Sequence, residues 1–417
     1  MVYCLEPYMT FDQRVFGNYA VCCRSYPLPY TIQEKTIEEH FNSDEMVNLR
    51  NEFETNAIGP YTQKYCEKCL NHETAGIQSR RQFRHEQFAS TTPAFQDQVK
   101  NIISQSKQKV HLKLQDMRFY SIEFKMFGNL CNLKCMMCHP HQSSSLAVDW
   151  KKNGKWDGPT HINSYMYIDS TEFYREMDIM LSNTNQIKFT GGEPLMNMDI
   201  LDLIYYAKDN NYAKDLELII ITNGTKAPSK FLEVIQHFKS VTINISCDGV
   251  FDVNEYQRVG SSFSVIDKNI DLFKQYPNVK VQLTSAITAI NVGSIDQIID
   301  YANYKKMHAD VTSIVLKPKW ISVYVLPKHI RQHYINKLKY KNDQVISALS
   351  YDNEEYMKLF PEFIQQLRAK DRRDNTDFLQ IIPELKDELR KTIDIRTIYS
   401  TDSDLRSYKN IDSDIDI

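Results

Sequence analysis

The sequence predicts an α/β fold in which a partial (β/α)6 barrel follows a cysteine-rich N-terminal segment and precedes a helical extension. From residue 118 onward, short runs rich in Ile, Val and Phe alternate six times with helical segments. Such alternation gives a parallel sheet with right-handed crossovers. Polar residues with chemical character follow the first four runs, where parallel sheets carry their reacting groups.

The six strands are expected over residues 119–127, 186–190, 216–222, 241–247, 279–287 and 311–316. Their lengths and apolar content suit buried parallel strands. Helices are expected between them over residues 171–181, 200–210, 230–239, 265–275 and 295–304. Six such repeats predict a curved or partly closed barrel, and we assign it to residues 111–327.

Residues 1–110 are predicted to form one unit that carries five of the nine cysteines. A strand is expected over residues 19–21 and an amphipathic helix over 36–53, starting at an N-cap threonine. Residues 90–109 are polar and suit either a linker or a surface helix. Residues 328–417 are predicted to be helical, with an interruption at 371–377 and an acidic tail over 400–417.

The composition excludes several classes of protein. A net charge of -3 gives no basic excess for nucleic-acid binding. No stretch approaches the length of a membrane helix, and the N-terminus does not resemble a signal peptide. We therefore expect a cytoplasmic protein with no nucleic-acid or membrane partner. In a reducing compartment, clustered cysteines indicate metal binding or catalysis rather than disulfides.

One loop after the first strand carries Cys131, Cys135 and Cys138. This spacing allows three kinds of metal centre. A zinc ion would need a fourth ligand, such as His139. A c-type haem would use the C-x-x-C-H pattern but leave Cys131 unused. A [4Fe–4S] cluster would use all three thiolates and keep one iron open for a small molecule.

The CxxxCxxC loop is similar to the signature of the radical S-adenosylmethionine (radical SAM) superfamily, with Met137 where an aromatic residue is common. The resemblance implies a TIM-like partial barrel whose open iron binds SAM. Reductive cleavage of SAM then gives a 5′-deoxyadenosyl radical, which takes hydrogen from a peptide, protein or small metabolite. It also implies a small electron donor such as flavodoxin or ferredoxin.

The loops after the next three strands resemble further motifs of that family. The Gly-Gly-Glu-Pro turn at residues 191–194 resembles the motif that binds the SAM amino group. The arginine in the segment 254–260 matches one that reaches the SAM carboxylate, a pairing that suits a bidentate guanidinium. Plain turns and an exposed arginine are the alternative interpretations. The SAM-binding residues implied are Gly191, Gly192, Glu193, Asn223, Ser246 and Arg258.

The N-terminal cysteines resemble those of the twitch (half-SPASM) domain, which usually follows the barrel but here precedes it. The resemblance rests on residues 17–23, 66–69, 71–76 and 79–81. It implies an auxiliary [4Fe–4S] cluster for electron transfer, held by Cys4, Cys22, Cys66 and Cys69. Cys22 is preferred to Cys23 because it follows the predicted strand. A structural zinc site and a three-cysteine site remain alternatives.

Two classes of function therefore remain. The first is a radical SAM enzyme of unspecified substrate. The second is a non-catalytic iron–sulfur or zinc protein with a redox or interaction role, which would have no use for Glu193, Ser246 and Arg258. Affinity for SAM separates the two classes.

Overall fold

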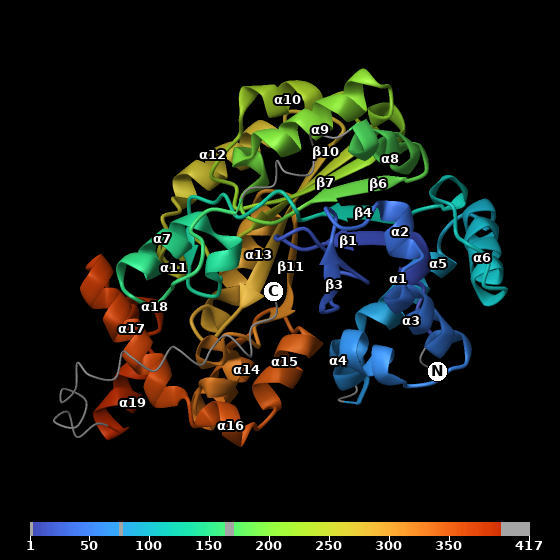
Figure 1. Ribbon diagram of the computed structural model, residues 1–417. Helices are drawn as coiled ribbons and strands as arrows, with labels where there is room; N and C mark the ends of the chain where they lie inside the picture. Colours follow the sequence, from blue (N-terminus) through green and yellow to red (C-terminus); the bar gives the residue numbers. More distant parts are fainter. Residues whose placement is uncertain (1–2, 75–77, 163–170, 393–417) are drawn as a thin grey trace.

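The computed structural model describes residues 3–74, 78–162 and 171–392, and its centre is a parallel sheet (Figure 1). Six strands lie side by side in chain order, and each pairs in parallel with the next. They are β4 (Ser121–Phe124), β6 (Gln186–Phe189), β7 (Glu217–Thr222), β8 (Ser240–Ser246), β10 (Val279–Ile287) and β11 (His308–Ile314). The predicted α/β fold with a large parallel sheet is confirmed.

The predicted barrel helices also form, and the sheet packs against them (Figure 1). They are α8 (Thr171–Ser182), α9 (Met198–Asp209), α10 (Ser229–Ile235), α12 (Phe263–Phe273) and α13 (Ile295–Tyr304). Burial alternates along β8, where Val241, Ile243 and Ile245 are fully buried and the residues between them are partly exposed. The strands therefore bury one apolar face, and their other face is open enough to carry polar groups.

The N-terminal segment extends the same sheet. β1 (Thr10–Gln13) pairs in parallel with β4, and β2 (Asn18–Ala20) and β3 (Pro27–Thr31) continue antiparallel, giving nine strands. The predicted boundary near residue 110 therefore separates two segments that share one sheet. β2 lies where a strand was expected, whereas β1 was not foreseen.

The single helix expected over residues 36–53 is wrong, because the chain forms α2 (Ile37–Phe41) and α3 (Asp44–Glu54). Thr36 caps the first with a capping box, and Ser43 caps the second. The break falls at Asn42, whose amide exchanges hydrogen bonds of 2.8 Å with the backbone of Leu112. A long-range contact thus ends a helix that the local pattern would continue.

Four more helices complete the N-terminal part: α1 (Glu6–Met9), α4 (Pro60–Thr74), α5 (Arg80–Ala89) and α6 (Pro93–Lys107). A linker and a surface helix were both considered for residues 90–109, and the structure has a helix there, α6. It is fixed to the core by Phe95, Val99 and Ile102, which are 5% exposed or less. Spacing of three and four residues places these side chains on one face.

The C-terminal extension is helical within the described residues and lies below the barrel in Figure 1. Its helices are α14 (Lys328–Lys337), α15 (Asp343–Ser350), α16 (Glu354–Met357), α17 (Phe360–Asp374), α18 (Phe378–Ile381) and α19 (Leu385–Thr392). The interruption expected at 371–377 is shorter, because α17 continues to Asp374 and ends at left-handed Asn375. The predicted acidic tail lies outside the described residues. No helix in the described ranges is long and apolar enough to cross a membrane.

Candidate active site

The three-cysteine loop is held against the segment that carries Arg258. The short strand β5 (Lys134–Cys135) pairs antiparallel with β9 (Arg258–Val259), and Cys135 lies opposite Arg258. The Met136 amide donates to the Gln257 carbonyl at 2.9 Å. Helix α11 (Asp252–Gln257) leads directly into β9. The middle cysteine therefore sits on a small ribbon rather than in a free loop.

Three consecutive serines fasten the other side of the loop at the start of α7 (Ser144–Lys152). Ser143 Oγ donates to the Leu133 carbonyl at 2.6 Å. Ser144 Oγ accepts from the Cys131 amide at 3.1 Å, and Ser145 Oγ donates to the Cys131 carbonyl at 2.7 Å. Sequence reasoning missed these serines, because only the fold brings their hydroxyls to the cysteine backbone.

The Gly-Gly-Glu-Pro turn packs backbone to backbone against the same loop. The Glu193 amide donates to the Leu130 carbonyl at 2.6 Å. Gly191 has φ +133°, which disfavours any residue with a Cβ atom. A Cβ at Gly192 would lie 2.3 Å from the Leu130 carbonyl oxygen. Gly191 is therefore required by its backbone conformation, and Gly192 by the close approach of the two loops.

The Glu193 carboxylate is buried, at 1% exposure, and is used within the protein. It accepts hydrogen bonds from Thr222 Oγ1 at 2.6 Å, the Asn223 amide at 2.7 Å and the Leu195 amide at 3.0 Å. Burial raises the pKa of Glu193, and these donors oppose that rise. The Glu193 carboxylate therefore joins two loops within the protein. Of the residues in this turn, Gly191 is the one that lines a cavity.

Asn223 links the loop after β7 to the cysteine loop. Its Nδ2 donates to Asn132 Oδ1 at 3.0 Å and lies 4.0 Å from Cys131 Sγ. Asn132 in turn donates to Thr225 Oγ1 at 3.0 Å. Asn223 therefore lies beside the first cysteine, as expected for a residue of the same site.

Arg258 lies at the second cysteine, but most of its guanidinium is already paired. Nε lies 2.7 Å from Asp248 Oδ2, and Nη2 donates to Asp248 Oδ1 at 3.1 Å. The remaining nitrogen, Nη1, lies 4.0 Å from Cys135 Sγ. Asp248 is fully buried and also accepts from the Ala286 amide at 2.7 Å. Asp248 was not assigned a role from the sequence, although it lies two residues after Ser246.

Ser246 is the last residue of β8 and is partly exposed at the same rim. Its neighbour Cys247 is fully buried, and its Sγ donates to the Gly249 carbonyl at 3.0 Å. Burial raises the pKa of the Cys247 thiol to about 12. Cys247 is thus a buried thiol whose Sγ is used within its own loop.

The three loop thiols are held neutral by burial. Burial raises the pKa of Cys131 and of Cys135, and raises that of Cys138 to about 11. Arg258 opposes the rise at Cys135. Metal binding at these sulfurs must therefore release protons, so metal affinity will increase with pH.

The spacing of the sulfurs bears on the kind of metal centre. Within the described residues, no three of the donor atoms of Cys131, Cys135, Cys138 and His139 lie within 4.8 Å of one another. Ligands of one zinc ion are separated by roughly 3.8 Å, since each Zn–S bond is about 2.3 Å. His139 Nδ1 also accepts a hydrogen bond from the His141 amide at 3.3 Å.

A cavity of about 540 Å³ lies beside the cysteine loop. One wall carries Cys135, Cys138 and Gly191, while the other comes from residues 317–320 and from helix α17. Helix α17 is joined to α11 through a 3.0 Å hydrogen bond from Tyr256 to Asp371. The C-terminal extension therefore lines the cavity through α17.

Four of the N-terminal cysteines border a second, smaller cavity. Its lining includes Cys4, Cys22, Cys66 and Cys69, together with the cations Arg80 and Arg81. Burial raises the pKa of Cys4 and Cys22, and raises that of Cys66 to about 12. Among the residues that the structure describes, no three of these sulfurs lie within 4.8 Å.

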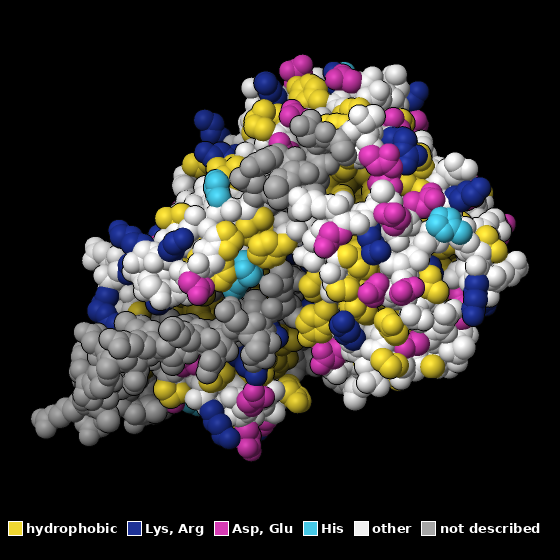
Figure 2. Space-filling view, viewed as in Figure 1, with side chains coloured by type: hydrophobic (Ala, Val, Ile, Leu, Met, Phe, Trp, Pro, Cys, Tyr) yellow, Lys and Arg dark blue, Asp and Glu magenta, His cyan; other side chains and the backbone are white. Residues whose placement is uncertain are grey.

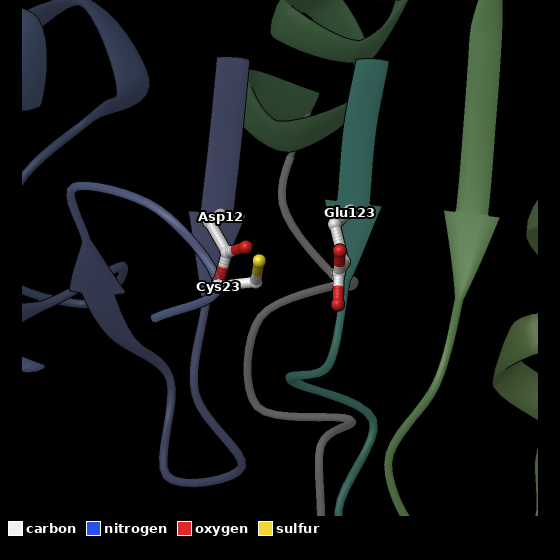
Figure 3. A group of neighbouring side chains, drawn as sticks. All are labelled: Asp12, Cys23 and Glu123. Carbon is white, nitrogen blue, oxygen red and sulfur yellow. The ribbon is translucent and has the colours of Figure 1, made fainter. Parts of the chain in front are cut away.

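Cys23 faces a different neighbourhood from Cys22. In Figure 3 its sulfur lies between Asp12 at the end of β1 and Glu123 on β4, with the three donor atoms within 4.8 Å. Arg14 pairs with Asp12 at 2.5 Å, and Lys188 pairs with Glu123 at 2.9 Å. Because both carboxylates already have cationic partners, this group gives no case for a bound metal ion.

Comparison with known proteins identifies the central part of the chain. Residues 126–304, less than half of the chain, match the family model of the radical SAM superfamily. An uncharacterized protein of Methanocaldococcus jannaschii is 27% identical over 178 residues, 42% of this chain and 55% of that protein. A probable GTP 3′,8-cyclase of Methanococcus aeolicus is 25% identical over 259 residues, 60% of this chain and 75% of that protein.

A solved structure, Streptococcus suis SuiB bound to S-adenosylmethionine, covers 79% of this chain and 66% of that one. It shares 14% identity with a TM-score of 0.34, which is too low to place any residue. The matched segment 126–304 includes the three-cysteine loop and the three segments that contact it through Glu193, Asn223 and Arg258. Residues 126–304 are therefore similar to the radical SAM superfamily, whose family model they match.

Proposed function

We propose that this protein binds SAM at a [4Fe–4S] cluster on Cys131, Cys135 and Cys138 and uses it for hydrogen abstraction from a substrate. The observation that carries the proposal is that one cysteine loop contacts the loops after β6, β7 and β8. Those contacts are Leu130 with Glu193, Asn132 with Asn223 and Cys135 with Arg258. When bound, the cluster would supply the electron that cleaves SAM to a 5′-deoxyadenosyl radical.

The residues of the chain would then bind and orient the cofactors. The CxxxCxxC spacing of Cys131, Cys135 and Cys138 and the match of residues 126–304 to the radical SAM family model favour a cluster over zinc. Gly191, Gly192, Ser246 and Asn223 would contact SAM at the rim. Arg258, held by Asp248, would place its free nitrogen between Cys135 and the SAM carboxylate. Glu193 would act as a positioning residue that joins the loops, since its carboxylate is fully engaged.

A second [4Fe–4S] cluster on Cys4, Cys22, Cys66 and Cys69 would serve electron transfer. Their shared cavity and the nearby Arg80 and Arg81 support this set, since cations offset the negative charge of thiolate ligands. A small electron donor such as flavodoxin or ferredoxin would reduce the enzyme in the cytoplasm. The substrate would be a peptide, protein or small metabolite; the relatives named as GTP 3′,8-cyclases favour the last class.

Anaerobic reconstitution with iron and sulfide tests the proposal. The wild-type chain is expected to bind about 4 iron atoms per cluster and to release 5′-deoxyadenosine from SAM after reduction. A Cys138→Ser variant should lose the 5′-deoxyadenosine product, whereas the buried Cys247→Ser control should retain it. A reconstituted chain that does not bind SAM would instead support the non-catalytic redox or interaction protein.

A further inference from the structure

Cys22 and Cys23 are adjacent in the chain but face different neighbours. Cys22 lines the N-terminal cavity together with three other cysteines. Cys23 is not among the residues that line this cavity, and its sulfur lies between Asp12 and Glu123 in Figure 3. Two neighbouring thiols compete for one ligand position unless the backbone that carries them is fixed. The turn over residues 22–25 therefore decides which thiol reaches the cavity.

Arg14 is placed to fix this turn. Its backbone closes the hairpin between β1 and β2, since the Arg14 amide donates to the Asn18 carbonyl and the Gly17 amide donates to the Arg14 carbonyl, both at 2.8 Å. Figure 2 shows Lys and Arg side chains spread over the visible face of the molecule, whereas Arg14 is 3% exposed. The charge of Arg14 therefore lies inside the protein, where it needs partners.

The guanidinium of Arg14 contacts the surroundings of both cysteines. Nη2 donates to the Cys22 carbonyl at 2.9 Å and to the Ser25 carbonyl at 2.6 Å. Nη1 donates to Asp12 Oδ1 at 2.5 Å, and Asp12 is one of the carboxylates that flank Cys23. Because Asp12 belongs to β1, one planar group joins the turn to the sheet.

Ser25 closes the turn from within. The Ser25 amide donates to the Cys22 carbonyl at 3.1 Å, and Ser25 Oγ accepts from the Val21 amide at 3.0 Å. These hydrogen bonds join near neighbours in the chain, so they set the shape of the turn. The contacts of Arg14 set its direction, because they reach from the turn to a strand.

We infer that Arg14 is a positioning residue of the N-terminal cluster site, which directs Cys22 into the cavity and Cys23 away from it. The inference rests on the proposed function, because it assumes the second [4Fe–4S] cluster. Arg14 does not itself line the cavity, so it acts through the backbone of Cys22. A lysine in its place would keep the charge beside Asp12 but lose the fork that reaches two carbonyls. One substitution therefore separates positioning from charge compensation.

A chelator challenge of the reconstituted chain, followed by electron paramagnetic resonance of the reduced clusters, tests the inference. Only a cluster with an open iron binds SAM, so the signal that SAM leaves unchanged belongs to the N-terminal cluster. In Arg14→Lys this signal should be lost about tenfold faster than in the wild-type chain, the effect of losing one charge-assisted hydrogen bond. The signal of the three-cysteine cluster should be lost at the wild-type rate.

Two results in Arg14→Lys would overturn the positioning role. Equal acceleration of both signals would show a general loss of the fold. Wild-type rates for both signals would show that Arg14 serves only to compensate the charge of Asp12.

Arg331→Lys is the matched control. Arg331 is 1% exposed and, like Arg14, binds a carboxylate and backbone carbonyls, but it lies in α14 and lines neither cavity. Its partners include Leu326, Leu349, Tyr351 and Asp352. Both signals should be lost at wild-type rates in this variant. Faster loss of the N-terminal signal there would refute a specific role of Arg14.

Iron analysis tests the direction of the two thiols. With Arg14 present, Cys22→Ser and Cys23→Ser should differ by about 4 iron atoms per chain. In the Arg14→Lys background this difference should shrink at least about twofold, because the lost hydrogen bonds no longer favour one thiol. An undiminished difference overturns this inference alone. A wild-type chain that forms only one cluster refutes the proposed second cluster and this inference with it.

Discussion

At the scale of single residues, the site depends on contacts that leave no room for substitution. Gly192 lets the Gly-Gly-Glu-Pro turn touch the cysteine loop, and Glu193 then ties that turn to the loop after β7. Asp248 holds two nitrogens of Arg258 while the third points at Cys135. Each of these three residues acts by fixing the position of a neighbour. Their substitution should therefore alter cluster binding rather than the fold.

Gly192→Ala is expected to separate the two loops, because its Cβ would collide with a backbone oxygen that cannot move aside. Iron content at the three-cysteine site and SAM cleavage should both fall at least about tenfold. Gly154→Ala is the control for backbone strain without a collision, since Gly154 has φ +66° and nothing lies within 4 Å of a Cβ there. Normal iron content and SAM cleavage in Gly192→Ala would contradict this reading of the turn.

Cys22→Ser and Cys23→Ser form a matched pair of adjacent substitutions. Cys22 borders the cavity that it shares with Cys4, Cys66 and Cys69, whereas Cys23 faces Asp12 and Glu123. Iron analysis after reconstitution should give about 4 iron atoms in the first variant and about 8 in the second. The opposite result would make Cys23 the ligand.

His40 predicts a pH dependence of stability. Burial, with Arg50 nearby, lowers the pKa of His40 from 6.5 to about 3. Between these values the unfolded chain binds a proton that the folded protein does not, so stability falls as the pH drops below 6.5. Because of His40, the free energy of unfolding should fall by about 2 kcal/mol when the pH is lowered from 7 to 5.

Urea unfolding at the two pH values measures this effect, with His40→Phe as the comparison. The variant keeps an aromatic ring against Tyr19, whose ring centroid lies 4.2 Å from that of His40. It should lose less stability on acidification than the wild-type chain. Equal losses in both proteins would show that His40 does not titrate in this way.

At the scale of elements, the site is assembled from segments that are far apart in the chain. Strand β9 pairs with β5, and α17 reaches α11 from the C-terminal extension. The side chain of Lys370 lies 3.8 Å from the Tyr256 ring centroid, next to the hydrogen bond from Tyr256 to Asp371. Helix α17 is therefore anchored beside Arg258 and closes the cavity.

Tyr256→Phe should loosen α17 while leaving its ring in place. The lost hydrogen bond is worth about 1 kcal/mol, so the amides of α17 should exchange with solvent several times faster. Hydrogen exchange followed by mass spectrometry measures this. Tyr304→Phe is the control, because Tyr304 is 81% exposed at the end of α13. Wild-type exchange rates in α17 would show that other contacts anchor the helix.

At the scale of the whole molecule, one nine-stranded sheet connects the segments that carry the two predicted cluster sites. β1 to β3 join the N-terminal cysteines to the strand that leads into the three-cysteine loop. Filling the two sites would add binding free energy that only the folded state receives.

Anaerobic removal of iron with a chelator should therefore lower the Tm of the whole chain by several degrees. Calorimetry before and after removal measures the shift. Reconstitution with iron and sulfide should restore the original Tm. A Tm that does not depend on iron would indicate that the clusters add nothing to the stability of the sheet.

The sequence alone was sufficient where the signal is local. All six barrel strands lie within a few residues of their predicted ranges, because apolar runs bounded by turns depend on neighbours in the chain. The spacing of Cys131, Cys135 and Cys138 and the loop at 191–194 likewise pointed to the site. The match of residues 126–304 to the radical SAM family model supports the same family resemblance.

The tertiary structure alone decided which groups meet across the chain. It joined β1 to β4, broke the helix at Asn42, engaged Glu193 inside the protein and paired Asp248 with Arg258. It also brought the cations of α17 to face the cysteine loop. Such contacts join residues that are distant in sequence, and no local periodicity records them. The sequence therefore determined what kind of chemistry the chain carries, and the fold decided which side chains remain available to a substrate.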